Sequence, residues 1–455
     1  MLNKILIANR GEIAVRVIRA CQELGIKTVA VYSEADRDAL HMQLADEAIC
    51  IGPAKATDSY LDMQSILSAA VVTNAQAIHP GFGFLSENST FATMCEEMNI
   101  VFIGPKPITI HQMGDKANAR ELMIEAGVPV IPGSEGFIHS MDEAKTAAKS
   151  LGYPVMLKAS AGGGGKGMRR VANEEELETA YVNAKSEAKA AFGNDDMYME
   201  KIIEHARHIE VQILADNHGN VIHLGERDCS LQRKNQKVIE ESPSVAIDEE
   251  QRQLLGETAV KAAKYVHYQN AGTIEFLLDV DSNYYFMEMN TRIQVEHPVT
   301  EMATEVDIVK QQILIASGQE LSLKQEDVRL TGHTIECRIN AENPAFNFAP
   351  SPGTLNYLLV PSGGLGLRVE SAMYQGAEIP PYYDAMIAKI ITKGADRPEA
   401  IAKMKRALGE LVIEGIITNQ FFQEDLLNDA TFISGEYDTS YLETDFLKNW
   451  VPRID

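Results

Sequence analysis

The stretch KILIANRGEIAVRVIRACQELGIKTVAVY, residues 4–32, decides the fold class of this chain. It opens with a short apolar run typical of a buried strand and ends, at residues 27–32, with a second one. Between them, Ile13, Val17, Cys21 and Leu24 recur at helical spacing, and Gly25 marks the end of the helix. A strand, a helix and a strand in this order predict a parallel sheet with a right-handed crossover.

The same alternation continues beyond this stretch. We expect further strands near 76–79 and 100–103, with a helix near 61–71 between them. Residues 1–112 are therefore predicted to form a doubly wound α/β domain, followed by a helical linker at 113–130.

The remainder of the chain has a different pattern. Residues 131–203 are predicted to form a small α+β unit with a strand at 155–159, a helix at 174–191 and a strand at 197–200. Residues 204–455 are mostly strands, expected at 208–215, 220–225, 271–278, 284–289, 333–340 and 385–392, before a helix at 397–411. The fold class is thus multidomain, α/β followed by α+β.

Composition narrows the functional class. The 455 residues include 41 Lys and Arg and 65 Asp and Glu, a formal charge of −24, which argues against binding a nucleic-acid backbone. No apolar run approaches the ~18–20 residues of a membrane span, and the run at residues 5–8 is too short for a secretory signal. Five widely spaced cysteines suit neither a zinc site nor a disulfide set. We expect a cytoplasmic protein without nucleic acid or membrane as partner.

A glycine cluster at residues 162–167 follows the strand that contains Lys158. It is not a Walker A loop, because Gly167 stands where Ser or Thr must hold magnesium. It is not a dinucleotide fingerprint either, because no helix opens at it. The cluster is either a flexible connector or a mobile cover for phosphate groups, and the flanking Lys158 and Lys166 favour the cover.

A second candidate site lies on a predicted β-hairpin at residues 271–290. If Asp281-Ser282 forms a two-residue turn, Glu275 lies directly opposite Glu288, where two like charges repel. A proton or a hard cation would offset this repulsion, and Asn290 lies two residues further on the same face. The alternative is a solvated sheet face on which two glutamates happen to align. A cation together with a phosphate cover would indicate that the protein handles ATP.

Several longer motifs resemble one known family, biotin carboxylase, over essentially the whole chain. They are Ala8-Asn9-Arg10-Gly11-Glu12-Ile13-Ala14, His79-Pro80-Gly81, Gly83-Phe84-Leu85-Ser86-Glu87-Asn88, Phe102-Ile103-Gly104-Pro105, Gly114-Asp115-Lys116, Glu226-Arg227-Asp228-Cys229-Ser230, Glu288-Met289-Asn290-Thr291-Arg292-Ile293-Gln294-Val295-Glu296-His297-Pro298-Val299-Thr300-Glu301 and Glu336-Cys337-Arg338-Ile339-Asn340-Ala341-Glu342. The resemblance implies an ATP-grasp fold after the N-terminal domain. Residues 131–203 would be its glycine-rich lid, and residues 204–455 its C-terminal part together with the C-terminal domain.

The resemblance also implies a site. Nucleotide-binding residues would be Lys116, Lys158, Gly163, Gly164, Gly165, Lys166, Gly167, Glu200, Lys201, Ile203, His208, Gln232 and Leu277. Metal ligands would be Glu275, Glu288 and Asn290, holding two Mg²⁺ or Mn²⁺ ions. Bicarbonate would be surrounded by Lys237, Arg292, Gln294, Val295 and Glu296. Catalysis would depend on Lys237, Arg292, Glu296 as general base, and Arg338 facing the biotin ureido oxygen.

The implied reaction uses ATP and bicarbonate to carboxylate biotin on a carrier protein. Arg292 and Lys237 would hold bicarbonate for attack on the γ-phosphate while Glu296 takes its proton, giving carboxyphosphate. Without the family context, Glu296 and Arg338 would be interpreted as a structural ion pair.

The partners follow from the same resemblance. We expect a biotin carboxyl carrier protein, carboxyltransferase subunits and a homodimer with Arg19 and Glu23 at the contact. The string Ala402-Lys403-Met404-Lys405 is not a biotin attachment motif, so the carrier is expected to be separate. Acetyl-CoA is the expected acceptor of the whole complex, which would place the chain in fatty acid synthesis.

Two positions depart from the family pattern. Phe82 stands where Tyr is frequent and Asn235 where His is frequent, which puts in doubt a polar role for either side chain. Two rival functions also remain open. One is a different ATP-grasp ligase, which Arg292, Gln294 and Arg338 disfavour. The other is an inactive nucleotide-binding regulatory subunit, which the presence of every expected catalytic residue disfavours.

Overall fold

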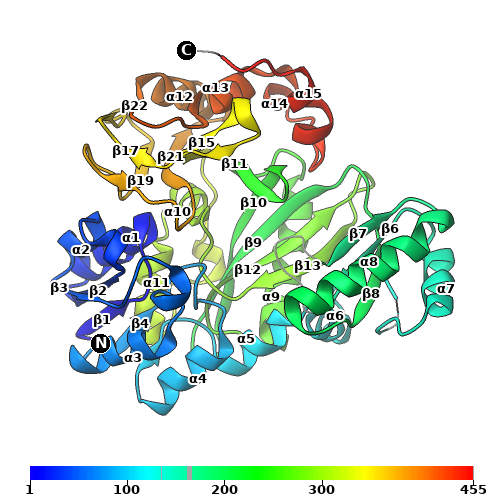
Figure 1. Ribbon diagram of the computed structural model, residues 1–455, viewed down its shortest axis with the longest axis horizontal. Coiled ribbons are helices and arrows are strands. Elements are labelled where there is room, and N and C mark those ends of the chain that lie inside the picture. The colour runs from blue at the N-terminus through cyan, green and yellow to red at the C-terminus, as the bar shows by residue number, and fades with distance from the viewer. Residues whose placement is uncertain (135, 161–166, 454–455) are drawn as a thin grey trace.

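The computed structural model describes residues 1–134, 136–160 and 167–453, and its N-terminal part is built on a five-stranded parallel sheet (Figure 1). The strands, in the order β3-β2-β1-β4-β5, are β1 (Lys4–Ile7), β2 (Lys27–Tyr32), β3 (Glu47–Cys50), β4 (Ala77–His79) and β5 (Val101–Phe102). The helices are α1 (Gly11–Glu23), α2 (Leu40–Leu44), α3 (Met63–Val72), α4 (Ser89–Glu97) and α5 (Pro107–Gly114). The predicted doubly wound sheet is confirmed, although the edge strand β3 was not predicted.

The apolar run at residues 5–8, which begins in strand β1, is buried on both faces of the sheet. Ile5 and Ile7 pack into one hydrophobic cluster, whereas Leu6 and Ala8 pack into another. Successive side chains of a strand point to opposite faces, so both faces of this sheet are covered.

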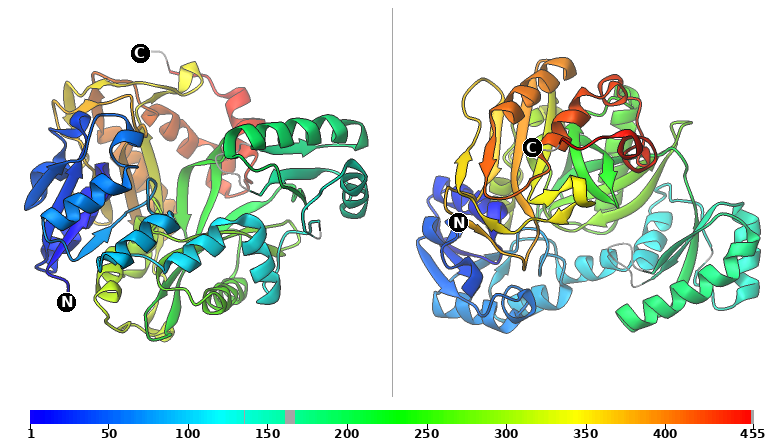
Figure 2. Two further views of the ribbon diagram at one scale, coloured as in Figure 1. Left: turned by 60° about the horizontal axis from the view of Figure 1, so that its bottom comes forward. Right: turned by 45° about the horizontal axis from the view of Figure 1, so that its top comes forward.

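The second part of the chain is a small lid that projects from the body of the molecule (Figures 1 and 2). It contains a three-stranded antiparallel sheet in the order β7-β6-β8 and helices on its face. Its elements, with the helix that precedes it, are α6 (Lys116–Glu125), α7 (Met141–Leu151), β6 (Val155–Ala159), β7 (Met168–Val171), α8 (Glu174–Phe192) and β8 (Met197–Lys201). The predicted glycines Gly163, Gly164 and Gly165 and the predicted Lys166 lie outside the described residues.

The third part is an eight-stranded antiparallel sheet that forms the centre of the molecule. Its order is β13-β12-β9-β10-β11-β14-β21-β19. The strands are β9 (Arg207–Ala215), β10 (Val221–Arg233), β11 (Gln236–Ser242), β12 (Asn270–Leu278), β13 (Tyr284–Asn290), β14 (His333–Asn340), β19 (Leu367–Ser371) and β21 (Met386–Gly394). Short strands complete the C-terminal part: β15 (Glu342–Asn343), β16 (Ala349–Pro350), β17 (Gly353–Thr354), β18 (Tyr357–Leu359), β20 (Glu378–Ile379) and β22 (Val412–Glu414).

The helices that pack against this central sheet are α9 (Glu249–Tyr265), α10 (His297–Thr304), α11 (Ile308–Ala316), α12 (Arg397–Glu410) and α13 (Gln420–Asn428). Two short helices, α14 (Ala430–Ser434) and α15 (Leu447–Asn449), follow α13 in the chain. Helix α10 packs against β10, β11, β14 and β21, and α1 packs against α11, β19 and β21. The N-terminal part therefore contacts the same sheet that α10 covers.

The hairpin of β12 and β13 places Glu275 opposite Glu288 as predicted, but the predicted turn is wrong. The Asp279 N–H donates to the Asn283 carbonyl (2.9 Å), so the loop has three residues instead of two. The longer loop shifts the register by one residue at the tip. A bulge next to Glu275 shifts it back.

The bulge allows β13 to place Phe286 in the core and Glu288 on the opposite face of the sheet. Phe286 pairs with Phe276 in the core, and both rings are almost fully buried. In a regular strand Glu288 would share the core face with Phe286, since side chains alternate. The extra residue, Met287, breaks this alternation and turns Glu288 to the other face.

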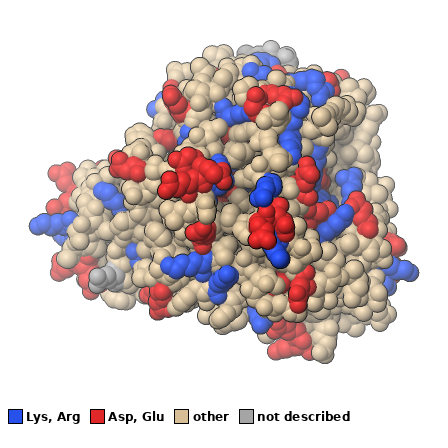
Figure 3. All heavy atoms as spheres, turned by 180° about the vertical axis from the view of Figure 1, so that it is seen from behind, with Lys and Arg blue, Asp and Glu red and all other residues tan. Residues whose placement is uncertain are grey.

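The surface carries charged side chains of both signs. On the face shown in Figure 3, acidic and basic side chains are interspersed. Among the described residues, every helix is too short or too polar to cross a membrane.

Candidate active site

A row of charged residues crosses four neighbouring strands of the central sheet. Arg227 of β10 lies opposite Glu210 of β9, Glu210 opposite Glu275 of β12, and Glu275 opposite Glu288 of β13. Three carboxylates side by side repel one another, and burial increases the cost of their charge. The cations around this acidic row therefore decide whether it can remain ionised.

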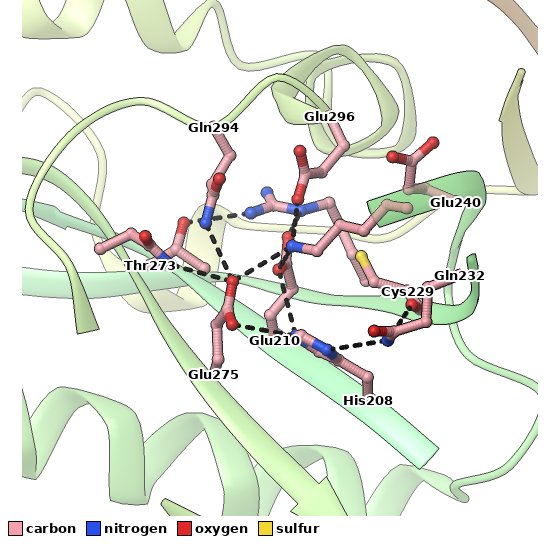
Figure 4. Close-up of polar contacts among 12 residues, drawn as sticks. His208, Glu210, Cys229, Gln232, Glu240, Thr273, Glu275, Gln294 and Glu296 are labelled. Carbon is pink, nitrogen blue, oxygen red and sulfur yellow. Dashed lines mark hydrogen bonds and ion pairs between the residues drawn. The ribbon is translucent and has the colours of Figure 1, made fainter. Parts of the chain in front are cut away.

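Lys237 of β11 supplies the central cation, between the Glu210, Glu275 and Glu296 side chains that Figure 4 shows. Its ammonium lies 2.5 Å from Glu210 Oε2, 3.1 Å from Glu275 Oε1 and 2.5 Å from Glu296 Oε1. Burial opposes the charge on Lys237, but the acidic groups around it raise its pKa well above the ordinary value. The ammonium therefore stays charged at all ordinary pH values.

Other partners bind the ends of the acidic row. Arg227 is fully buried and donates to Gln212 Oε1 (2.8 Å) and to Thr300 Oγ1 (2.9 Å), besides its ion pair with Glu210. His208 Nε2 lies 3.1 Å from Glu275 Oε2.

Lys116, the first residue of α6, reaches the far end of the acidic row. Its ammonium lies 3.0 Å from Glu288 Oε2, and both side chains are about one-third exposed. Every carboxylate of the acidic row thus has a cationic neighbour.

Glu296 occupies the N-terminal end of α10 and is 1% exposed. Its two oxygens are held by the Lys237 ammonium and by the Arg338 guanidinium (Nη2 to Oε2, 2.9 Å). Burial alone would raise the pKa of Glu296, but Lys237, Arg338 and Arg227 hold it well below its ordinary value. Glu296 is therefore an ionised carboxylate at neutral pH.

The loop before α10 adds further polar groups. Arg292 donates to Glu87 Oε2 (2.9 Å), to Gln294 Oε1 (2.8 Å) and to Asn290 Oδ1 (3.0 Å). The Gln294 amide donates to Glu275 Oε1 at 3.1 Å, which joins the loop to the acidic row. This loop thus presents one guanidinium and one amide next to Glu296.

Val295 contributes a main-chain group to the same loop. Its carbonyl accepts a hydrogen bond from the buried Lys389 ammonium of β21 (2.7 Å). Lys389 also forms an ion pair with Glu12 of α1 (3.0 Å). One lysine thus connects the N-terminal part of the chain to the loop that carries Glu296.

The predicted nucleotide residues fall into two groups. His208, Gln232 and Leu277 lie at the acidic row: Gln232 Nε2 is 3.3 Å from His208 Nδ1, and Leu277 is directly opposite His208. Lys158 and Glu200 form an ion pair on the lid sheet.

Two of the predicted nucleotide residues, Lys201 and Gly167, form hydrogen bonds within the lid. A third, Ile203, has no described polar side-chain contact. The Lys201 ammonium donates to the carbonyls of Gly152 (2.8 Å) and Tyr153, at the end of α7. The Gly167 N–H donates to Glu187 Oε2 (3.1 Å). Ile203 lies two residues beyond the end of β8 and is half-buried.

The metal prediction can be tested against the donors present. Glu275, Glu288 and Asn290 offer oxygens on adjacent strands, and Asn290 Nδ2 is already 2.9 Å from Glu275 Oε1. Hard cations prefer such oxygens. His208, Glu210 and Glu275 form a second group whose ligand atoms lie within 4.8 Å, but it includes an imidazole nitrogen. The Glu275–Glu288 end offers oxygens alone and therefore fits a hard cation better, which would replace the Lys237 and Lys116 ammonium groups that these two carboxylates now bind.

The two departures from the family pattern have clear places in the structure. Lys234 and Asn235 form the two-residue turn between β10 and β11, both with positive φ (49° and 62°). Asn tolerates this left-handed region well, so Asn235 serves the backbone of the turn. Phe82 is partly buried against the cluster around Ile13, and its carbonyl accepts from Asn9 Nδ2 (2.7 Å).

Several residues of this network were not predicted as site residues. They are Glu12, Glu87, Glu210, Arg227, Glu240 and Lys389. One signal for Glu210 was available, because His208, Glu210 and Gln212 place a polar residue at every second position of an otherwise apolar strand. Such a pattern indicates a polar sheet face under cover.

Comparison with known families matches three segments of the chain. Residues 1–110 match the "Biotin carboxylase, N-terminal domain", residues 115–324 the "Carbamoyl-phosphate synthase L chain, ATP binding domain", and residues 336–444 the "Biotin carboxylase C-terminal domain".

Individual relatives agree with these matches. Biotin carboxylase 1 of Bacillus subtilis is 61% identical over 98% of this chain and 99% of its own length. The crystal structure of the biotin carboxylase subunit of pyruvate carboxylase superposes with a TM-score of 0.86 at 53% identity, covering 99% of this chain and all of that one. The solved biotin carboxylase domain dimer of Hydrogenobacter thermophilus 2-oxoglutarate carboxylase, in complex with MgADP, ADP and bicarbonate, superposes with a TM-score of 0.94 at 52% identity, with the same coverage of both chains. The chain belongs to the biotin carboxylase family, and it is an ATP-dependent carboxylase with the ATP-grasp fold.

Proposed function

We propose that the chain uses ATP and bicarbonate to carboxylate biotin on a biotin carboxyl carrier protein, through carboxyphosphate, with ADP and phosphate as products. One observation carries this proposal: the buried, ionised Glu296 lies between the Lys237 ammonium and the Arg338 guanidinium, next to the acidic row. A base between two fixed cations suits the deprotonation of a small anion that both cations attract.

The nucleotide would lie along the acidic row and the lid. Lys116 and Lys158 would bind phosphate groups, and the residues Gly163, Gly164, Gly165, Lys166 and Gly167 remain predicted contacts to them. Glu200, Lys201, Ile203, His208, Gln232 and Leu277 would line the rest of the nucleotide site. The salt bridges that Lys116 and Lys158 now make to Glu288 and Glu200 support this role, because a phosphate can replace a carboxylate as the partner of an ammonium.

Glu275, Glu288 and Asn290 would hold magnesium, or manganese in its place, as two ions. Bound metal would neutralise the charge on the transferring phosphoryl group. The relative from Hydrogenobacter thermophilus, solved with MgADP and bicarbonate, supports this part of the proposal.

Bicarbonate would be held by Arg292, Lys237, Gln294 and the Val295 main chain. In this position the Glu296 carboxylate would take the bicarbonate proton as the oxygen attacks the γ-phosphate. Arg292 already has three oxygen partners within 3.0 Å, which fixes the direction of its guanidinium.

Arg338 would face the ureido oxygen of biotin and stabilise the negative charge that forms there. The phosphate released from carboxyphosphate would take the N–H proton of biotin. Arg338 is bound by carboxylates on one side only, and its guanidinium has more donors than these contacts use.

The family resemblance is the main support for the composition of the complete complex. We infer carboxyltransferase partners, a cytoplasmic location, and acetyl-CoA as the acceptor, so that the product serves fatty acid synthesis. Pyruvate and 2-oxoglutarate, named in the relatives above, are the competing acceptors. A homodimer through Arg19 and Glu23 is supported by their exposure and by the dimer described for the relative. The domain boundaries at residues 112, 130 and 203 belong to the same proposal.

The decisive experiment measures phosphate release from ATP with bicarbonate and free biotin each added or omitted. We expect slow release that needs bicarbonate, rises with biotin and is nearly lost in Glu296→Ala. Release that ignores both additions would contradict the proposal and favour a different ATP-grasp ligase or a regulatory nucleotide binder. Malonyl-CoA formation, after addition of a carrier and carboxyltransferase, tests the acceptor.

A further inference from the structure

Arg338 is shared between two carboxylates. Its Nη2 donates to Glu296 Oε2 at 2.9 Å, and its Nε donates to Glu240 Oε1 at 2.6 Å. Both partners are almost fully buried. The two carboxylates therefore bind the same Nε–Nη2 edge of the guanidinium and together fix its position.

Among the described residues, Arg338 is the one hydrogen-bond partner of the Glu240 carboxylate. Glu240 lies on β11 directly opposite Glu336 of β14, a second buried acid. Among the described residues, its Oε2 has no hydrogen-bond partner, and its Oε1 contacts only Arg338. Burying a carboxylate with a single partner is costly, so this ion pair is not explained by its contribution to stability.

The reaction changes one of the two partners of Arg338. When Glu296 takes the proton of bicarbonate it becomes neutral, and its hydrogen bond to Arg338 loses the charge that strengthens it. Arg338 is needed directly afterwards, at the ureido oxygen of biotin. Its position in that step must be set by a group that does not take part in the proton transfer.

We propose that Glu240 is this positioning residue, which keeps Arg338 in place while Glu296 is protonated. The inference rests on the proposed roles of Glu296 and Arg338. Glu240 makes no hydrogen bond to Lys237, Arg292 or Gln294, so it can hold Arg338 without disturbing the bicarbonate site.

The charges around Glu240 are consistent with this role. Burial and the Glu296 charge raise the pKa of Glu240 more than Arg338 and Lys237 lower it, so that it lies at about 7. Once Glu296 is neutral, this last contribution disappears and the pKa of Glu240 falls. Arg338 therefore keeps one ionised partner throughout.

The test compares two activities of Glu240→Gln: bicarbonate-dependent phosphate release without biotin, and carboxylation of free biotin. Glutamine keeps the shape but removes the charge, and a hydrogen bond to a charged group contributes about 1.5–3 kcal/mol. We expect kcat/KM for biotin to fall about ten- to a hundredfold, while KM for bicarbonate and for ATP changes less than about threefold. Glu240→Asp keeps the charge and should recover part of the loss.

The pH profile gives a second readout. The charged groups that face Glu240 are Lys237 on its own strand, Glu336 and Arg338 on β14, and Glu296 at the start of α10. The buried thiols of Cys229 on β10 and Cys337 on β14 also interact with its charge. In the unmodified protein, kcat/KM for biotin should fall only at a pH below 7. The pKa of Glu240 is about 7 while Glu296 is ionised and is lower once Glu296 is neutral, so Glu240 takes up a proton only there. Glu240→Gln should lack this decline.

Glu241 offers a matched control on the same strand. It is equally buried and also pairs with an arginine, Arg397 (2.7 Å), but on the other face of β11. We expect Glu241→Gln to lower the melting temperature without lowering kcat/KM for biotin relative to the biotin-independent rate.

Three outcomes decide the matter. If Glu240→Gln lowers both activities equally, or if Glu241→Gln reproduces its effect, Glu240 is only structural and the proposal is wrong. If Arg338→Gln lowers kcat/KM for biotin while Glu240→Gln does not, the proposal fails and the role of Arg338 stands. If Arg338→Gln itself has no effect on biotin, the assigned function of Arg338 fails first.

Discussion

Replacing Lys389 by methionine should weaken bicarbonate binding without any direct contact to the anion. The buried ammonium holds the Val295 carbonyl at 2.7 Å and Glu12 at 3.0 Å. Methionine has a similar unbranched shape, so the change removes the charge and leaves little cavity. The loop between Gln294 and Glu296 then loses the donor that fixes its main chain.

The magnitude follows from these two contacts. A hydrogen bond to a charged donor contributes about 1.5–3 kcal/mol, so KM for bicarbonate should rise about ten- to a hundredfold if the loop loses its position. Removing one partner of a buried ion pair costs about 3–5 kcal/mol of stability. In Glu12→Gln/Lys389→Met, the loss of stability should be smaller than the sum of the single losses, because the two residues are in contact.

The assay is phosphate release against bicarbonate concentration in bicarbonate-free buffer, together with a melting curve. Lys393→Met is the control, since Lys393 lies on the same strand, is more exposed, and binds Thr331 instead of the loop. A melting temperature that falls while KM for bicarbonate matches that of the control would refute the reasoning.

Three further predictions follow from single contacts. Glu288→Gln removes one anionic oxygen from the proposed metal site and should raise the magnesium concentration for half-maximal ADP binding about tenfold; an unchanged midpoint in a calorimetric titration would exclude Glu288 as a ligand. Burial opposes ionisation of Glu241, but His333 and Arg397 hold its pKa at about 2, below the ordinary 4.5. Glu241→Gln should therefore lower the free energy of unfolding by about 3 kcal/mol at neutral pH. In urea unfolding, this difference from the unmodified protein should vanish as the pH falls from 4.5 towards 2. Asn235→Val should destabilise the turn at φ 62° by about 1–2 kcal/mol, whereas Asn235→Gly should not, as melting curves of the two variants would show.

Much of the fold follows from local patterns in the sequence. The strand, helix and strand at residues 4–32 are where their apolar spacing predicts them, and strand 155–159 matches residue for residue. Strand β11 was missed, because its sequence Gln-Lys-Val-Ile-Glu-Glu-Ser contains charged residues that are rarely buried. They are buried here because Arg338 and Arg397 reach them from elsewhere in the chain.

The residues of the candidate site also fall into those that the sequence identified and those that it did not. Residues within the long motifs, such as Arg292 and Glu296, could be named from the sequence, and the structure places them together. Glu240 and Lys389 could not be named. Their importance depends on partners about 100 or more positions away in the chain, and no local pattern contains that information.

The bulge at Met287 has a consequence for engineering the molecule. It separates the part of β13 that packs in the core from the part that carries Glu288. The alternation of side chains between the two faces of the strand is therefore independent in the two segments. The tip beyond Asp279 is exposed, with Val280 at 73%. Chain termini or an inserted peptide placed at this tip should leave the spacing of Glu275 and Glu288 intact, which makes the hairpin a suitable site for circular permutation or for attaching a fluorescent reporter.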